Sequence, residues 1–429
     1  MGTKTQKLSN VVDQIIEWQS VFVGDGSTGL TAVAGRGYFI DTTSGSVTVT
    51  LPASPKIGDI VQLKDYARTW DTNAVTIASA LFDGFSSTNT FNTRAQTITL
   101  VYMDGTKGWS LINEDTTTGL GEKFVTATGG TVTESGNFKI HSFTGDGCFV
   151  VSCAGNPGGS DTVDYLVVAG GGGGGSYHGG GGGAGGYRES SGTASGCYTA
   201  SPLGACVSAL PVSATTYPVT VGAGGVKAIN SPICQVSTNG SNSVFSTITS
   251  AGGGSGGGYC GSVNRTGGSG GSGGGGNNSV PGLQCGAAGG TGNTPPVSPP
   301  QGNNGGSAGS DDAAFRGGGG GGGATSVGGD VTPTSPYDSP GNVGPGGNGA
   351  TSSITGSPVT RAGGGGGGST ALGGTAGPGG GAQGNHNGTD DNNDATANTG
   401  GGGGGAGAPP CFSGGAGGKG IVIIRYKFQ

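Results

Sequence analysis

Charged side chains are scarce in this chain, and their scarcity excludes several classes of function. Only 10% of the 429 residues are Asp, Glu, Lys or Arg, and the formal net charge is −6. Binding to nucleic acid requires a basic stripe that neutralises phosphates, so we expect no nucleic-acid partner. No apolar run approaches the ~20 residues that span a bilayer, so we expect no membrane insertion.

Residues that carry catalysis or bind metals are also few. The three histidines lie far apart in the sequence, His141 is expected to face solvent on a strand, and no Cys-X-X-Cys pair is present for zinc. Residues 390–394 have the acidic composition of a calcium loop without EF-hand spacing, and residues 311–312 are slight evidence for a pair of glycosidase carboxylates. We therefore expect no enzyme, no metal and no cofactor.

Glycine dominates what is present, and its distribution divides the chain. Glycine accounts for 106 residues and proline for 20, together 29% of the sequence. Residues 1–164 contain only 21 of these glycines, so the 265 residues that follow are about one-third glycine. Such a share without a fixed period usually indicates low complexity or disorder. The first part, in contrast, has an ordinary β-rich composition.

Residues 23–115 have the pattern of short β-strands. Thr and other polar residues alternate with Val, Ile and Leu over residues 46–51, 59–64 and 97–102. This period of two predicts half-buried antiparallel strands in a sandwich or prism. Upstream, residues 6–22 carry apolar side chains three and four residues apart, which predicts a short amphipathic helix. Such a helix would serve trimerisation or docking, or would pack on its own domain.

Composition and pattern together predict five segments. Residues 1–22 form an N-terminal helix or attachment segment, residues 23–115 a β-rich module, residues 116–122 a linker, residues 123–162 a small β-hairpin module, and residues 163–429 a glycine-rich domain.

Two apolar runs border the glycine-rich domain. Residues 163–169 pass directly into a glycine run, and residues 421–426 follow the last one. Because both are rich in β-branched residues, we expect them to pair as strands and to clamp the glycine-rich body. Between them, a turn, a short strand, an alanine and a glycine run recur over residues 239–258 and 348–368, which indicates a repeated supersecondary unit.

The glycine runs themselves allow two interpretations. Alone, a run is a flexible coil, because glycine loses the most conformational entropy on ordering. Packed side by side as polyglycine-II, an extended left-handed helix with three residues per turn, runs without Cβ atoms can approach closely and bond to several neighbours. At least six runs of similar length are tied to strands or turns. We therefore expect an all-β fold, with N-terminal β-sandwich or prism modules followed by packed polyglycine-II helices that short β-strands clamp.

Eight cysteines leave the redox state open. Six lie in the glycine-rich domain, where disulfides would suit an extracellular protein. Cys148 with Cys153, and Cys197 with Cys206, are close enough in sequence to form local bridges. Free buried thiols are the alternative.

The segments between glycine runs carry side chains suited to recognition. Residues 187–216, 277–316, 330–347 and 383–399 contain Tyr, Pro, Asn and Asp. Aromatic rings beside Asn and Asp suit the faces and hydroxyls of glycans, although loops on a scaffold also serve as simple connections. The candidate receptor-binding residues are Tyr187, Arg188, Tyr198, Phe315, Arg316, Tyr337, Asp338, Asn385, His386 and Asn387.

The framework residues resemble a family of phage tail-fibre proteins. Residues 39–52, 58–61 and 106–109 are similar to a β module in phage tail fibres, notably those of cyanophages. Residues 129–141, 164–170 and 420–426 are similar to the glycine-rich tip domain of the same proteins. This resemblance covers most of the chain. It implies a virion component outside the cell, a fibre or adhesin that is usually a homotrimer.

The function that this resemblance implies is receptor binding without catalysis. The N-terminal region would attach to other tail or baseplate proteins, and related tips bind receptors through the loops that join their glycine runs. The expected ligand is a host cell-surface glycan, above all a polysaccharide, or a protein. One alternative is a purely structural virion or extracellular filament component without a specific ligand. A weaker alternative is a polysaccharide depolymerase.

Overall fold

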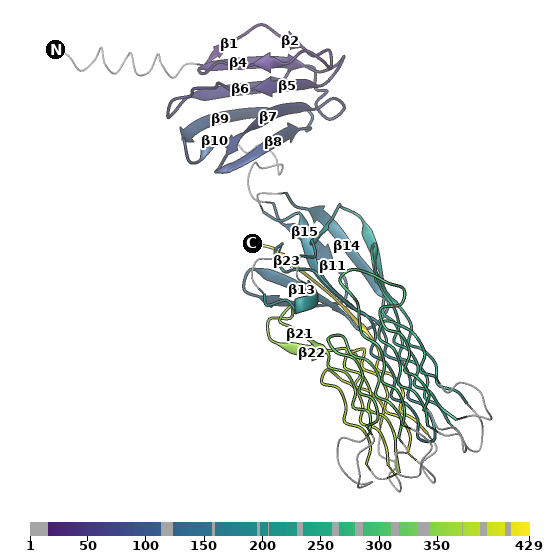
Figure 1. Cartoon of the computed structure of the whole chain (residues 1–429). Helices are drawn as coiled ribbons and strands as arrows, with labels where there is room; N and C mark the ends of the chain where they lie inside the picture. Colours follow the sequence, from purple (N-terminus) through teal and green to yellow (C-terminus); the bar gives the residue numbers. More distant parts are fainter. Residues whose placement is uncertain are drawn as a thin grey trace, which may run out of the picture. The chain divides into compact units, whose positions relative to one another are not determined.

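The computed structural model of the protein contains two compact units, Met1–Lys123 and Phe124–Gln429 (Figure 1). It describes residues 16–112, 123–156, 159–194, 198–204, 206–229, 235–259, 266–278, 286–309, 317–332, 343–370, 372–386, 393–407 and 413–429. Within these residues the only helical element is one 3-10 turn, η1 (Pro202–Gly204). The all-β class predicted from the sequence is confirmed.

The N-terminal unit is a single ten-stranded sheet with an apolar core. Its strands are β1 (Glu17–Trp18), β2 (Phe22–Val23), β3 (Leu30–Thr31), β4 (Arg36–Asp41), β5 (Val47–Thr50), β6 (Ile60–Asp65), β7 (Val75–Phe82), β8 (Phe85–Phe91), β9 (Thr97–Asp104) and β10 (Gly108–Leu111). The hydrogen-bonded order is β1-β4-β6-β9-β10-β7-β5-β3, with β2 on β4 and β8 on β7. Consecutive strands β4, β5, β6 and β7 alternate between the two halves of this order. Their inward side chains, among them Ile40, Val49, Leu63 and Ile77, are fully buried.

The prediction of antiparallel strands is wrong for several pairs of this sheet. Strand β4 pairs with β6, and β5 with β7, in parallel, whereas β6–β9, β7–β8 and β9–β10 are antiparallel. Alternating polar and apolar residues report only that one face of a strand is buried. The same pattern therefore arises for either direction of pairing.

The amphipathic helix predicted over residues 6–22 is wrong for residues 16–22, the part that the structure describes. Strand β1 pairs in parallel with β4, and the Glu17 N–H donates to the Gly35 carbonyl over 2.9 Å. The Trp18 ring stacks on Phe39 with its centroid 4.5 Å away. A helix of this length is marginal by itself, so backbone pairing and ring stacking determine the conformation.

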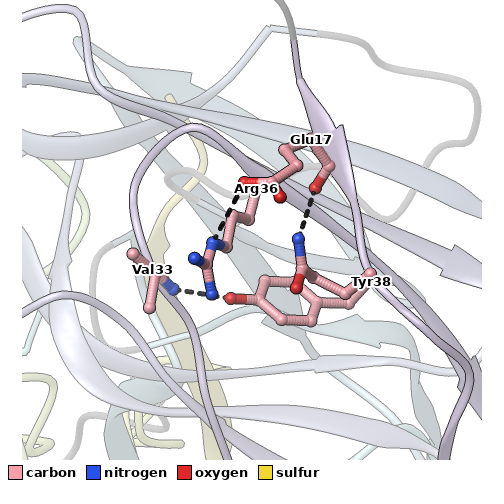
Figure 2. A network of polar contacts seen from close by, with 5 residues as sticks. Glu17, Val33, Arg36 and Tyr38 are labelled. Atoms are coloured by element: carbon pink, nitrogen blue, oxygen red, sulfur yellow. Dashed lines mark hydrogen bonds and ion pairs between the residues drawn. The ribbon is translucent and has the colours of Figure 1, made fainter.

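Polar contacts also fix the start of β4 (Figure 2). The Val33 N–H donates to the hydroxyl oxygen of the buried Tyr38 side chain over 2.8 Å, which closes the turn before the strand. The Arg36 Nε atom lies 3.6 Å from a carboxylate oxygen of Glu17. Because both charged side chains are exposed, this ion pair contributes at most about 1 kcal/mol.

The second unit contains two sheets that enclose an apolar core. One has the order β11-β14-β18-β19-β20, and the other has the order β12-β13-β23-β15-β16 with β17 on β15. The strands of this unit are β11 (Val125–Thr128), β12 (Thr131–Ser135), β13 (Phe138–Phe143), β14 (Gly147–Ala154), β15 (Thr162–Val168), β16 (Tyr187–Glu189), β17 (Leu210–Pro211), β18 (Thr216–Thr220), β19 (Ser243–Phe245), β20 (Ile248–Ser250), β21 (Ala350–Ser352), β22 (Val359–Arg361) and β23 (Ile421–Lys427). Strands β21 and β22 form a separate hairpin. Strands β11 to β14, in the segment expected to be a small separate module, thus share their sheets with later strands.

The expected pairing of the two apolar runs is confirmed, because β15 and β23 are antiparallel neighbours. Val167 and Ile424 belong to the core between the two sheets. Leu166 and Ile423, on the opposite face, cluster with Ala184 of the glycine-rich part. Burial on both faces explains why these two strands are continuously apolar instead of alternating.

His141 is buried in this sheet, so the prediction that it faces solvent is wrong. Its Nδ1 atom lies 2.7 Å from the Gly129 carbonyl oxygen, and its Nε2 atom lies 3.0 Å from the Tyr426 hydroxyl. Burial lowers the pKa of the imidazole below its ordinary value. The alternation along β13 does not reveal this, because β23 and the facing sheet cover the strand.

We expect His141 to make the second unit less stable as pH falls. The unfolded imidazole has an ordinary pKa of about 6.5, whereas the folded one is lower, so acid adds a proton preferentially to the unfolded chain. The contribution of the neutral imidazole is complete above this pH and is lost progressively below it. Urea unfolding at pH 7.5 and pH 5.5 should show a smaller decline for His141→Gln than for the wild type. Equal declines would contradict the assignment.

The glycine-rich part forms a body of extended backbone, which we call the glycine body. It comprises residues 170–186, 222–229, 235–242, 251–259, 266–278, 286–309, 317–332, 343–349, 362–370, 372–386, 393–407 and 413–420. Its passes run side by side away from β13, β15 and β23 (Figure 1). Both copies of the repeated sequence unit place a hairpin, β19–β20 or β21–β22, before a pass.

The pass formed by residues 170–175 shows how the glycine body is held together. Its N–H groups donate, in order along the chain, to the carbonyls of Ser241, Gly418, Gly183, Thr238, Gly415 and Gly180. Its carbonyls accept, in the same order, from the N–H groups of Gly253, Gly225, Gly403, Gly256, Ala228 and Ala406. These twelve bonds are 2.8 to 3.1 Å long. The pass therefore contacts six neighbouring passes and returns to each of them at every third residue.

Close packing of backbone explains the glycine content. A Cβ atom added to Gly172 would lie 2.0 Å from the Gly254 carbonyl oxygen, and one added to Gly402 would lie 1.9 Å from that of Gly182. The obstructing atoms belong to backbone that is itself hydrogen-bonded, so they have little freedom to move. Backbone hydrogen bonds, and not apolar side chains, thus form the interior of the glycine body.

Candidate functional site

The two ends of the glycine body have different surroundings. At one end Ala184, Ala324 and Ala362 cluster with the outer face of the six-stranded sheet. At the other, residues 176–178 turn the chain from the pass 170–175 into the pass 179–186. We call the second the far end.

Several passes end around this turn. The His178 N–H donates to the Gly407 carbonyl over 3.2 Å, and its carbonyl accepts from the Asn278 N–H over 3.4 Å. The Tyr259 N–H donates to the Ser176 carbonyl over 3.3 Å. The described segments that contain these residues stop at positions 259, 278 and 407. Three described passes therefore end at the far end.

Residues that flank further segments between passes are connected to the far end through backbone hydrogen bonds. The Gly368 N–H donates to the Gly179 carbonyl, the Gly318 N–H to that of Gly368, and the Gly344 N–H to that of Gly318. The candidate residues Phe315, Arg316, Tyr337, Asp338 and Asn387 lie outside the described residues. They belong to the segments 310–316, 333–342 and 387–392, whose described neighbours are at this end.

Asn385 and His386 are the described candidates at the far end. The Asn385 N–H donates to the Gly405 carbonyl over 2.8 Å, its own carbonyl accepts from the Ser369 N–H over 3.1 Å, and the residue is 5% exposed. Asn385 is thus part of the glycine body and is largely buried there, while its role in receptor binding stays a prediction. His386, next along the chain, is partly exposed.

Tyr187 and Tyr198 lie at the opposite end, beside the outer face of the six-stranded sheet, and their role in receptor binding stays a prediction. The Tyr187 ring is 1% exposed, and its hydroxyl donates to the Glu189 carboxylate over 3.0 Å. The Tyr198 hydroxyl donates to the Ser190 carbonyl over 3.2 Å. Burial raises the pKa of both phenols. Arg188 lies between the two buried residues of β16 and is only partly exposed.

These tyrosines surround buried charges that sequence reasoning missed. Asp164 lies opposite Arg425 on the β15–β23 pair, and both side chains are buried. Burial lowers the pKa of the Arg425 guanidinium, while Tyr198 and Asp164 counteract that shift. Glu189 accepts from the Tyr187 hydroxyl, the Ser201 N–H and the Ser352 hydroxyl. The sequence did contain a signal for these charges: Asp164 and Arg425 each interrupt an apolar run that was predicted to be a buried strand.

The proposed local disulfide between Cys148 and Cys153 is absent. Both residues are free thiols on β14, five positions apart. A strand rises about 3.3 Å per residue, so their Cα atoms are too far apart for a bridge, which spans less than about 7 Å. Cys206 is also a free, exposed thiol, and its proposed partner Cys197 lies outside the described residues.

No cluster of three or more His, Cys, Asp or Glu side chains that could hold a metal occurs in the described ranges. Across those same ranges, no helix has the length and apolar character to cross a bilayer.

Comparison with known proteins identifies the glycine body as a family feature. No curated protein matches the chain. A family model described as a glycine-rich domain matches residues 152–427, which is more than half of the sequence. The matched span includes β15, the glycine body and the whole of β23. The chain therefore belongs to the glycine-rich domain family.

Proposed function

We propose that the protein is a non-enzymatic receptor-binding fibre component of a virion, located outside the cell. In this proposal the N-terminal region attaches to other tail or baseplate proteins, and the protein assembles as a homotrimer. The glycine body presents the segments at its far end to a host-surface polysaccharide. One observation carries the proposal: the described residues that flank these segments lie together at one end of a hydrogen-bonded scaffold, whose other end is buried against a sheet. Binding loops of many proteins have this arrangement.

We infer that the passes of the glycine body are polyglycine-II helices. Such a helix has three residues per turn and no internal hydrogen bonds, so successive N–H groups point to different neighbours and every third one to the same neighbour. The partners of residues 170–175 follow this period. Six neighbours around one pass, and the lack of space for Cβ atoms, also support this conformation.

We expect the segments at the far end to be required for binding to host cells. Residues 260–265, 279–285, 310–316, 333–342, 387–392 and 408–412 would each be replaced by a Gly-Ser sequence of equal length, which leaves the described hydrogen bonds in place. Flow cytometry on a panel of cyanobacterial and other bacterial strains would measure binding of the labelled protein. At least one replacement should reduce binding tenfold or more without changing the thermal unfolding of the second unit.

Matched controls separate this function from the alternatives. Ile57→Ser and Val23→Ser change exposed apolar residues of the N-terminal unit and should bind like the wild type. A panel on which no variant and no wild-type protein binds would favour a purely structural filament component. New reducing ends in polysaccharide incubated with the protein would instead support a depolymerase.

A further inference from the structure

The turn at the centre of the far end has an unusual backbone. Tyr177 and His178 have φ angles of 50° and 53°, in the left-handed region that favours glycine. A non-glycine residue in that region costs of the order of 1 kcal/mol. Both neighbouring passes are glycine runs, yet these two positions carry large side chains. Burial of the His178 side chain offsets this cost at one position, whereas the Tyr177 ring is only partly buried, so its retention points to a function.

Contacts from three other passes hold this turn in place. The buried Asn277 amide donates to the carbonyls of Tyr177 and His178 over 2.8 and 3.0 Å. The Ser176 hydroxyl donates to the Tyr259 carbonyl over 3.1 Å. The His178 N–H is bonded to Gly407. The turn is thus ordered before any ligand arrives, which reduces the entropy that binding would cost.

Two tyrosine rings are presented by this arrangement. The Tyr177 and Tyr259 centroids lie 5.7 Å apart, with the ring planes inclined by 41°. The His178 ring is 2% exposed and supports Tyr177 edge-on, with its centroid 5.0 Å away. Both tyrosines are partly exposed. Each offers an apolar ring with a polar hydroxyl, which suits the apolar face and the hydroxyl groups of a sugar.

The position of Tyr177 and Tyr259 agrees with a central role in ligand binding. Passes 170–175 and 179–186 have neighbouring passes on all sides, so the turn that joins them lies in the middle of the far end. Binding energy concentrates in rigid aromatic residues at the centre of an interface. We propose that Tyr177 and Tyr259 form an aromatic anchor that stacks on one sugar ring of a cell-surface polysaccharide. This inference rests on the proposed receptor-binding function.

Tyr177→Gly tests the anchor, because it removes the ring and also relieves the left-handed backbone. We expect its binding to a strain recognised by the wild type to fall at least tenfold, while its melting temperature stays equal or rises. Tyr259→Ala should also weaken binding. The matched control is Asn398→Gly, which makes the same kind of change at another left-handed residue, next to Thr399 and Gly400 and away from the far end. Its binding should be unchanged.

Two treatments of the cells identify the ligand class. Periodate destroys sugars with vicinal diols, and protease destroys protein receptors, so binding should be lost after periodate and kept after protease. The opposite result would overturn the polysaccharide assignment. Equal binding by Tyr177→Gly and the wild type would overturn the anchor alone. Absence of wild-type binding to every strain would instead overturn the receptor-binding function on which the anchor depends.

Discussion

Replacing Gly182 by alanine should destabilise the second unit by about 3 kcal/mol or more, at or above the upper range for overpacked sites. The new Cβ atom would lie 2.1 Å from the Gly172 carbonyl oxygen. That oxygen accepts from the Gly403 N–H, whose own carbonyl accepts from the Gly182 N–H over 2.7 Å. Moving any one of these passes breaks hydrogen bonds to the other two. The strain therefore cannot relax locally.

Urea unfolding and amide hydrogen exchange would measure this effect. The matched control is Gly317→Ala, whose Cβ atom would lie 3.5 Å from the Val343 side chain, at an ordinary contact distance. It should remain within about 1 kcal/mol of the wild type. Wild-type amides of residues 170–175 should exchange slowly, because they open only with the glycine body. Exchange at free-coil rates, or a harmless Gly182→Ala, would contradict packed polyglycine-II helices.

The sequence predicted the two strands that border the glycine body better than the packing of passes inside it. Strands β15 and β23 were recognisable because side chains specify a doubly buried strand. The neighbours of a given glycine were not, since identical residues carry no information about which pass lies beside which. The alanines at positions 184, 324 and 362 provide part of this information, because their methyl groups fit against the six-stranded sheet. Only the structure shows that relation.

The residues of the candidate site were likewise predicted only in part, because the sequence does not show which passes lie side by side. Aromatic residues near glycine runs were expected to bind a ligand, but Tyr187 follows a run at the sheet end and fills a core. Tyr177 was overlooked because the sequence around it resembles a short interruption of one glycine run. The sequence shows that Tyr177 and His178 interrupt a glycine run, but only the structure shows that both adopt left-handed φ angles. Sequence alone could not place Tyr259 beside that turn.

Replacing Glu189 by alanine should destabilise the second unit by about 3–5 kcal/mol, the usual cost of removing one partner from a buried polar network. Glu189 is 2% exposed, and its carboxylate connects β16 with the nearby Ser201 and with Ser352, which is distant in the sequence. Without it, the Tyr187 hydroxyl, the Ser201 N–H and the Ser352 hydroxyl lose their acceptor. The buried Arg361 guanidinium also loses a carboxylate that counteracts the lowering of its pKa by burial.

Glu189→Gln distinguishes the loss of charge from the loss of shape. It retains one carbonyl oxygen in the same volume, so it should cost less than Glu189→Ala while remaining destabilising. Glu134→Ala is the matched surface control, because its carboxylate is 59% exposed and lies 4.0 Å from Lys139. Its effect should stay below about 1 kcal/mol in urea unfolding. If Glu189→Ala were as mild as this control, the apolar packing of Ala350 and Ile354 and the hydrogen bonds of Ser353 and Ile354 would suffice to hold hairpin β21–β22, and the buried carboxylate would be dispensable.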